Sequence, residues 1–200
     1  MRLALFYDPR KYWLERGKHY IEYAENSREV SVLRENFVRE LRKLGFSSAL
    51  EIGCGYGGAL KFVRGKFPKA RLEGIDFSKT MIENALNYLK GTGISARVAD
   101  ANKLPFATGS FDVVFSVTVL LHVPKNEIRA VADEMKRASG KYIVLVEPDA
   151  KIQNWFVKLF HSRHVFFHDY HELFSDCTLV SKKSLRQSGM DDAIFVFEKQ

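Results

Sequence analysis

The sequence lacks most features that mark secreted, membrane-spanning or fibrous proteins. It contains only two cysteines, Cys54 and Cys177, and five prolines in 200 residues, which excludes a small disulfide-stabilised domain and a collagen-like chain. No stretch approaches the roughly 18 consecutive apolar residues that a membrane span needs. The N-terminus also lacks the apolar segment and cleavage site of a secretory signal. We therefore expect a cytoplasmic protein with free thiols and no membrane span.

The composition is that of an ordinary globular domain. Hydrophobic residues make up 46% and charged residues 28% of the chain, and 200 residues suffice for one substantial core. The formal net charge is +7, with most of the excess in residues 29–71. Basic and acidic residues alternate there, as in Arg34-Glu35 and Arg39-Glu40, which favours a solvated helix surface over a nucleic-acid-binding face. The oligomeric state stays open.

Apolar spacing predicts helices and strands that alternate along the middle of the chain. Residues 28–44 have apolar side chains every three or four positions, which indicates an amphipathic helix. In the middle of the chain, strands are predicted over 47–52, 71–75, 94–99, 111–117 and 142–146, and helices between them over 58–67, 78–89 and 124–140. Towards the C-terminus, two helices are predicted over 151–161 and 169–175, and two strands over 178–184 and 193–197. Alternating strands and helices favour an α/β fold, a Rossmann-like doubly wound sheet that binds ligands at its carboxyl edge.

The strongest motif is a glycine cluster directly after the first predicted strand. Residues 50–58 read Leu-Glu-Ile-Gly-Cys-Gly-Tyr-Gly-Gly. Such glycines let the backbone turn tightly and approach a ligand closely, and the next helix offers free N–H groups at its positive end. Gly53, Gly55 and Gly58 also fit the Gly-x-Gly-x-x-Gly pattern of dinucleotide-binding proteins. The glycines alone therefore do not decide which ligand this loop would bind.

Further landmarks follow the glycine cluster in a defined order. Glu51 heads the cluster, and Asp76 and Asp100 end the next two predicted strands. The strings Leu-Pro-Phe at 104–106, Gly-Ser-Phe-Asp-Val-Val-Phe-Ser at 109–116 and Val-Leu-Leu-His-Val-Pro at 119–124 come next. Together these residues resemble the class I S-adenosylmethionine-dependent methyltransferases, especially the subgroup with the ubiquinone/menaquinone biosynthesis methylases. The resemblance covers about residues 28–147.

The resemblance implies an architecture and an activity. It implies a seven-stranded mixed sheet with helices on both faces, whose last strand is antiparallel and inserted beside the fifth. We expect one methyltransferase domain over 1–200, with an N-terminal cap region at 1–27, a cofactor-binding core at 28–147 and a substrate-side segment with a closing hairpin at 148–200. S-adenosylmethionine would be the cofactor and S-adenosylhomocysteine its product. The acceptor would be an oxygen, nitrogen or carbon nucleophile of a small molecule.

The resemblance also assigns roles to individual residues. Asp76 would accept the ribose hydroxyls, and Asp100 would take the adenine amino group. Glu51 would face the methionine ammonium group. The full cofactor-binding set expected in this way is Glu51, Gly53, Cys54, Gly55, Gly57, Asp76, Phe77, Asp100, Ala101, Ser116 and Val117.

Two residues are candidates for catalysis. Methyl transfer from a sulfonium depends largely on alignment and desolvation, and a base is needed only for a nucleophile whose proton has a high pKa. His122, just past the fourth strand, is a candidate base or substrate contact, with a structural role equally open. Tyr170 is the second candidate, because it lies in an aromatic segment that would cover the substrate.

A series of histidines in the C-terminal quarter raises the question of a metal. His161, His164, His168 and His171 are spaced to line one helix face, where they could bind a transition metal. A break near Asp169 argues against one continuous helix, so we expect no metal.

Three other functions remain open at this stage. An RNA or protein methyltransferase would carry the same motifs. An NAD(P)-dependent oxidoreductase would use a similar glycine loop. A protein could also bind S-adenosylmethionine without catalysis.

Overall fold

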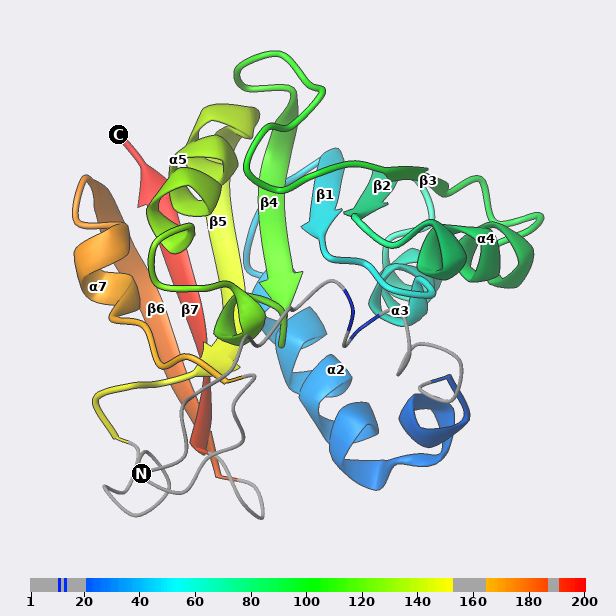
Figure 1. Cartoon of the computed structure of the whole chain (residues 1–200), viewed down its shortest axis with the longest axis horizontal. Helices are drawn as coiled ribbons and strands as arrows, with labels where there is room; N and C mark the ends of the chain where they lie inside the picture. Colours follow the sequence, from blue (N-terminus) through cyan, green and yellow to red (C-terminus); the bar gives the residue numbers. More distant parts are fainter. Residues whose placement is uncertain (1–10, 12, 14–20, 153–164, 187–190) are drawn as a thin grey trace.

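The computed structural model describes residues 11, 13, 21–152, 165–186 and 191–200. In this part the chain forms a seven-stranded sheet of order β3-β2-β1-β4-β5-β7-β6 (Figure 1). The strands are β1 (Ser48–Ile52), β2 (Arg71–Asp76), β3 (Ser95–Val98), β4 (Phe111–Val117), β5 (Ser139–Pro148), β6 (Cys177–Arg186) and β7 (Asp191–Lys199). The first five pair in parallel, and β7 lies antiparallel between β5 and β6. The expected sheet, including its inserted last strand, is confirmed.

The helices form where the apolar periodicity and the capping residues predict them. They are α2 (Arg28–Leu41), α3 (Gly58–Lys66), α4 (Lys79–Tyr88), α5 (Ile128–Ala138), α7 (Tyr170–Leu173) and the 3-10 helix η1 (Leu120–His122). Residues 21–26 are also helical. Ser27 and Ser78 cap α2 and α4, because each hydroxyl accepts the backbone N–H three residues further on.

Some expected boundaries are wrong. Pro124 does not lie in the first turn of a helix: α5 starts at Ile128, and the Pro124 carbonyl instead accepts N–H groups from Glu127 and Ile128 in a preceding turn. Gly140 does not end that helix either, because α5 stops at Ala138 and Gly140 belongs to β5. The helix expected over 151–161 falls mostly outside the described residues. The described structure contains no helix long and apolar enough to cross a membrane.

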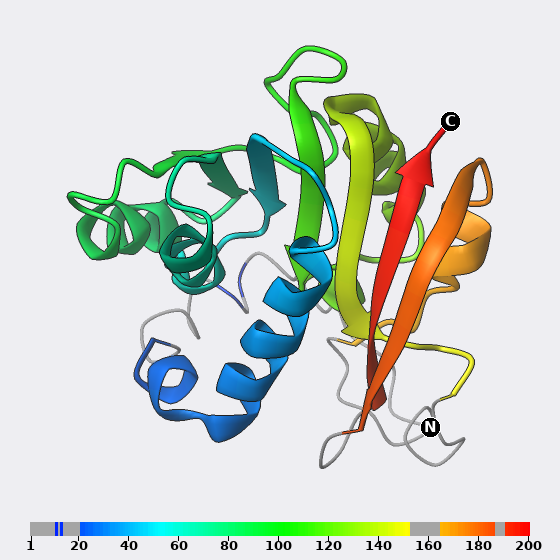
Figure 2. The same ribbon diagram turned by 180° about the vertical axis from the view of Figure 1, so that it is seen from behind.

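Two apolar layers hold the sheet between the helices. One apolar layer packs α2, α3 and α4 against one face of the sheet, which is turned toward the viewer in Figure 2. The other layer packs α5 and α7 against the opposite face. Phe115 of β4 belongs to the first layer and Val114 to the second. Burial on both faces explains the nearly continuous apolar run of this strand. The carboxyl ends of the parallel strands are thereby fixed along one edge of the sheet.

Candidate active site

A cavity of about 360 Å³ lies at the carboxyl ends of β1, β2 and β4. Residues from the N-terminal region, the glycine loop and the loops after β2, β3 and β4 line it. Ten of the expected site residues are among them, namely Glu51, Gly53, Cys54, Gly55, Asp76, Phe77, Asp100, Ala101, Val117 and His122. The topology therefore brings most of the expected site into one space.

The glycine loop presents bare backbone to this cavity. Gly53 and Gly55 have φ angles of +68° and +53°, in the left-handed region that favours glycine. A Cβ on Gly53 would come within 2.5 Å of the Val119 side chain, whereas the space beside Gly55 is open. A ligand can therefore approach the backbone at Gly55, while Gly53 lets the loop after β4 pack closely.

The next two glycines serve packing. Gly57 does not line the cavity, contrary to expectation, and its φ is +88°. A Cβ there would lie 2.6 Å from the Leu89 side chain, so Gly57 allows the start of α3 to meet the end of α4. A Cβ on Gly58 would collide with the Arg34 guanidinium and the Tyr56 hydroxyl, which lie directly above the start of α3.

Three carboxylates from consecutive strand ends line the cavity. The two oxygens of Asp76 accept the N–H groups of Ser78 at 2.8 Å and Gly55 at 3.0 Å, and burial raises its pKa. Asp100 accepts the Asn102 N–H at 2.9 Å. Glu51 is 3% exposed, and among the described residues its Oε2 has no hydrogen-bond partner. Burial raises the pKa of Glu51 well above its usual value, although nearby Arg34 opposes the rise.

Arg34 is a site residue that the sequence analysis missed. It extends from α2 into the cavity wall, where Nη2 donates to the Tyr56 hydroxyl at 2.6 Å and Nη1 to Glu25 at 3.0 Å. The sequence analysis assigned this arginine to a solvated surface. Its spacing offered a signal, because it lies four residues after Val30 on a face of α2 that turns inward.

The chain leaves β4 through a strained residue into η1. Thr118 has a φ of +53°, which is rare for a β-branched side chain. Buried Glu147 then accepts four hydrogen bonds, from the Ser116 hydroxyl at 2.9 Å and from the backbone N–H groups of Val119, Leu120 and Leu121. Burial raises the pKa of Glu147 to about 7, although these bonds oppose the rise. The Ser116 side chain therefore points to Glu147, and Ser116 does not line the cavity as expected.

The two catalytic candidates have different surroundings. His122, at the end of η1, lines the cavity, and its ring meets that of Trp13 edge to face at a centroid distance of 4.7 Å. Tyr170 is 1% exposed and packs against Phe195 in the core, and it is not among the residues that line the cavity. In the described structure Tyr170 therefore does not contact the cavity, and its catalytic role stays a prediction.

The histidine series does not form one helix face in the described residues. His168 precedes α7, is 5% exposed, and has Nε2 3.0 Å from the Val123 carbonyl. His171 lies in α7 against the Phe195 ring. His161 and His164 fall outside the described residues. Within the described part of the chain, no three His, Cys, Asp or Glu side chains are placed to hold a metal.

Comparisons with known proteins agree with this arrangement. Residues 49–140 match the model of a methyltransferase domain family. The chain is 39% identical over 109 residues to the ubiquinone/menaquinone biosynthesis C-methyltransferase of Desulfotalea psychrophila, covering 54% of this chain and 44% of that protein. It is 32% identical over 110 residues to the malonyl-[acyl-carrier protein] O-methyltransferase of Legionella pneumophila, covering 52% and 38%. The chain thus spans less than half the length of both relatives.

A solved structure extends the likeness to the whole fold. The magnesium protoporphyrin IX methyltransferase of Synechocystis, with bound S-adenosylhomocysteine, superposes with a TM-score of 0.74 over 96% of this chain and 98% of that one, at 14% identity. Residues 49–140 are therefore similar in sequence to a methyltransferase domain family and to the ubiquinone/menaquinone type, and the chain shares its fold with a solved methyltransferase.

Proposed function

We propose that this protein transfers a methyl group from S-adenosylmethionine to a small-molecule acceptor. The observation that carries the proposal is the convergence of Glu51, Asp76 and Asp100 with the bare backbone of Gly55 in one cavity. The matched domain and the relative named for ubiquinone/menaquinone biosynthesis support it. The free thiols support a cytoplasmic location, as part of the same proposal.

The residues present fit this cofactor. The unpartnered Oε2 of Glu51 would accept the methionine ammonium group, and Arg34 on the same wall would pair with the methionine carboxylate. Asp76 would accept the ribose hydroxyls, since each of its oxygens keeps a free lone pair. Asp100 would accept the adenine amino group. When bound, the cofactor supplies a methyl group already activated on a sulfonium.

The chain's own contribution is to align the reactants, to exclude water and to accept a proton. Apolar side chains such as Val119 and Val123 line the wall beside His122, which favours desolvation of the acceptor. The Trp13 ring fixes the face of the His122 imidazole by its edge-to-face contact. A neutral imidazole in this position would take the proton of an oxygen or nitrogen nucleophile.

The charge of the cavity disfavours a dinucleotide. Glu51, Asp76, Asp100 and Glu127 line it, and Arg34 is the only cation among the described lining residues. A pyrophosphate at the glycine loop would meet the buried carboxylate of Glu51, whereas a cationic sulfonium and ammonium complement it. An RNA or protein acceptor is the second candidate, because the same cofactor site would serve it.

Ligand binding and product analysis test the proposal together. In calorimetric titrations, S-adenosylhomocysteine should bind and NADH should not. Asp76→Ala should weaken S-adenosylhomocysteine at least about 10-fold, because ribose hydroxyls lose a charged acceptor, while Asp133→Ala on the exposed face of α5 should not. Methyl-labelled cofactor should then label a small-molecule fraction of cell extract. Binding of NADH alone, or label only in RNA or protein, contradicts the proposal.

A further inference from the structure

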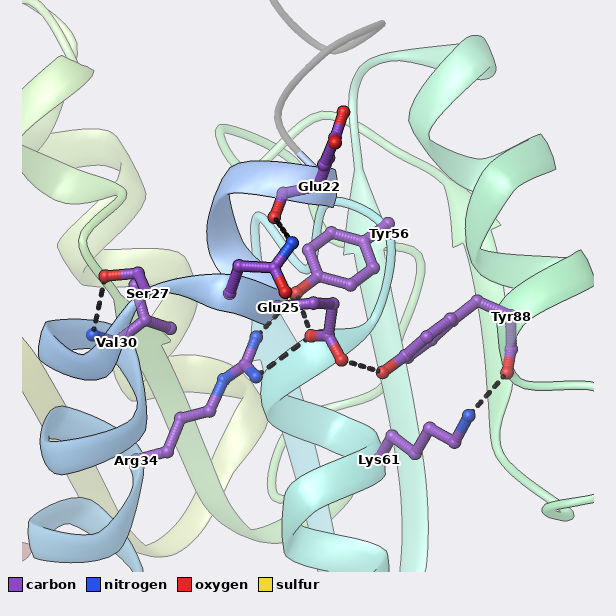
Figure 3. Close-up of polar contacts among 9 residues, drawn as sticks. Glu22, Glu25, Ser27, Val30, Arg34, Tyr56, Lys61 and Tyr88 are labelled. Carbon is purple, nitrogen blue, oxygen red and sulfur yellow. Dashed lines mark hydrogen bonds and ion pairs between the residues drawn. The ribbon is translucent and has the colours of Figure 1, made fainter.

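A group of hydrogen bonds ties the segment before α2 to the glycine loop and to α4 (Figure 3). At its centre is Glu25, which belongs to the short helical segment 21–26. Its Oε1 accepts the Tyr56 hydroxyl at 2.5 Å and Arg34 Nη1 at 3.0 Å, and its Oε2 accepts the Tyr88 hydroxyl at 2.7 Å. One carboxylate thus joins four separate parts of the chain.

The segment 21–26 forms part of the cover over the cofactor cavity. Ala24, the neighbour of Glu25, lines the cavity and is 2% exposed. The carboxylates beneath the cover are also buried, with Glu51 3% and Asp76 9% exposed. The position of segment 21–26 therefore affects how a ligand reaches the cavity from this side.

The chain offers a hinge at the end of this segment. Ser27 has extended backbone angles (φ −78°, ψ 120°) between the helical residues 21–26 and α2. The helix that follows is fixed, because Leu33, Phe37 and Leu41 are buried in the core. A change at Ser27 can therefore swing the segment away without unfolding α2.

We propose that Glu25 is a positioning residue that latches segment 21–26 over one side of the cofactor cavity, so that breaking its hydrogen bonds speeds the entry and exit of cofactor. This inference rests on the proposed cofactor site. It concerns residues outside that site, because neither Glu25 nor Tyr88 lines the cavity.

The charge of Glu25 suits this role. Burial alone would raise the pKa of Glu25, but hydrogen bonds from Tyr56, Tyr88 and Arg34 outweigh it and hold the pKa below its usual value. Burial and the bond to Glu25 raise the pKa of Tyr88 to about 12. Near neutral pH the acceptor is therefore ionised and the phenol keeps its proton, which gives the stronger, charge-assisted form of the bond.

Tyr88→Phe is the sharpest variant, because it removes one latch bond and leaves the cavity wall unchanged. Because neither Tyr88 nor Glu25 lines the cavity, we expect this bond in the free and in the ligand-bound protein, so its loss should favour opening of both equally. We expect the association and dissociation rate constants of S-adenosylhomocysteine, measured by stopped flow, to rise together about 3- to 10-fold, with Kd within about twofold. Glu25→Gln should raise both rates further. Glu22→Gln, an exposed carboxylate one turn earlier, is the matched control and should change neither.

The outcomes separate the latch from a general structural effect. A merely structural role of Tyr88 would weaken binding through faster dissociation alone, and that result would overturn the inference, as would unchanged rates. If the wild-type protein binds no S-adenosylhomocysteine, the proposed function fails instead. The latch is then judged by amide hydrogen exchange of residues 21–26, which should be faster in Tyr88→Phe than in Glu22→Gln, and equal exchange would refute it.

Discussion

Replacing Glu147 by glutamine tests the buried carboxylate that holds η1. Its Oε1 accepts the Ser116 hydroxyl and the N–H groups of Val119 and Leu120, and its Oε2 accepts the N–H of Leu121 at 3.3 Å. A glutamine oxygen can replace Oε1, but its amide N–H group then faces the Leu121 N–H, donor against donor. One buried donor is left unpaired, at a cost of about 1–3 kcal/mol.

The same substitution removes the cost of burying a charge, and this gain depends on pH. The pKa of Glu147 is about 7 in the folded protein against 4.5 for the usual group. The folded state therefore binds the proton more tightly, and this stabilisation is complete below pH 4.5 and lost as pH rises to about 7. The shift corresponds to about 3 kcal/mol of unfolding free energy. Glutamine does not titrate, so the unfolding free energy of the variant lacks this decrease with rising pH.

Urea unfolding of both proteins between pH 4.5 and 8 measures the effect. The wild type should lose about 3 kcal/mol relative to the variant across this range. The comparison uses the difference between the two proteins, because other groups titrate in the same window, including Asp192, whose pKa burial raises to about 6. Glu198→Gln, an exposed carboxyl on β7, is the control. A difference that stays flat with pH would show that burial of Glu147 does not govern its ionisation.

Four further substitutions test the glycine loop, the backbone strain after β4 and the proposed base. Gly57→Ala should destabilise the fold by about 1–3 kcal/mol, since its φ is positive and its Cβ would meet Leu89. Gly55→Ala should also lose stability through its positive φ, and it should in addition weaken S-adenosylhomocysteine binding, because its methyl group enters the cavity. Thermal unfolding measures the stability and calorimetry the binding, and a larger loss of binding in Gly57→Ala would contradict the assigned roles. Thr118→Gly should raise the unfolding free energy by about 1 kcal/mol by relieving the positive φ, and a loss of stability in urea would show that the threonine side chain contributes more than the strain costs. His122→Ala should lower kcat for methyl transfer more than it lowers cofactor affinity, and equal losses would remove His122 from the catalytic residues.

The parts of the fold that depend on local pattern were predictable from the sequence. The apolar run at 111–117 coincides with β4, and Ser78 caps α4 as expected. Both features depend only on residues that are neighbours in the sequence. The position of β7 beside β5 came from the family resemblance, since no local pattern specifies a pairing between strands far apart in the chain.

The same division holds for the site. Asp76 and Asp100 could be placed because strand ends share one edge of a parallel sheet. The spacing of Arg34 hints at an inward position, but its contact with Tyr56 could not be predicted, because that contact requires knowing that α2 lies against the start of α3. The bond from the Ser116 hydroxyl to Glu147, 31 residues away, could not be predicted either. Such contacts are decided by packing between distant segments.

The inserted strand β7 has a consequence for synthesis of the protein. β5 ends at Pro148 and β7 begins at Asp191, so the ribosome needs about 2–8 s to deliver the partner of a finished strand. During that interval the edge of β5 is unpaired, and such edges promote aggregation. Glu147 lies opposite Ala193 in this pairing. The strand that carries the η1-binding carboxylate therefore gains its second neighbour only when the last strand has been made.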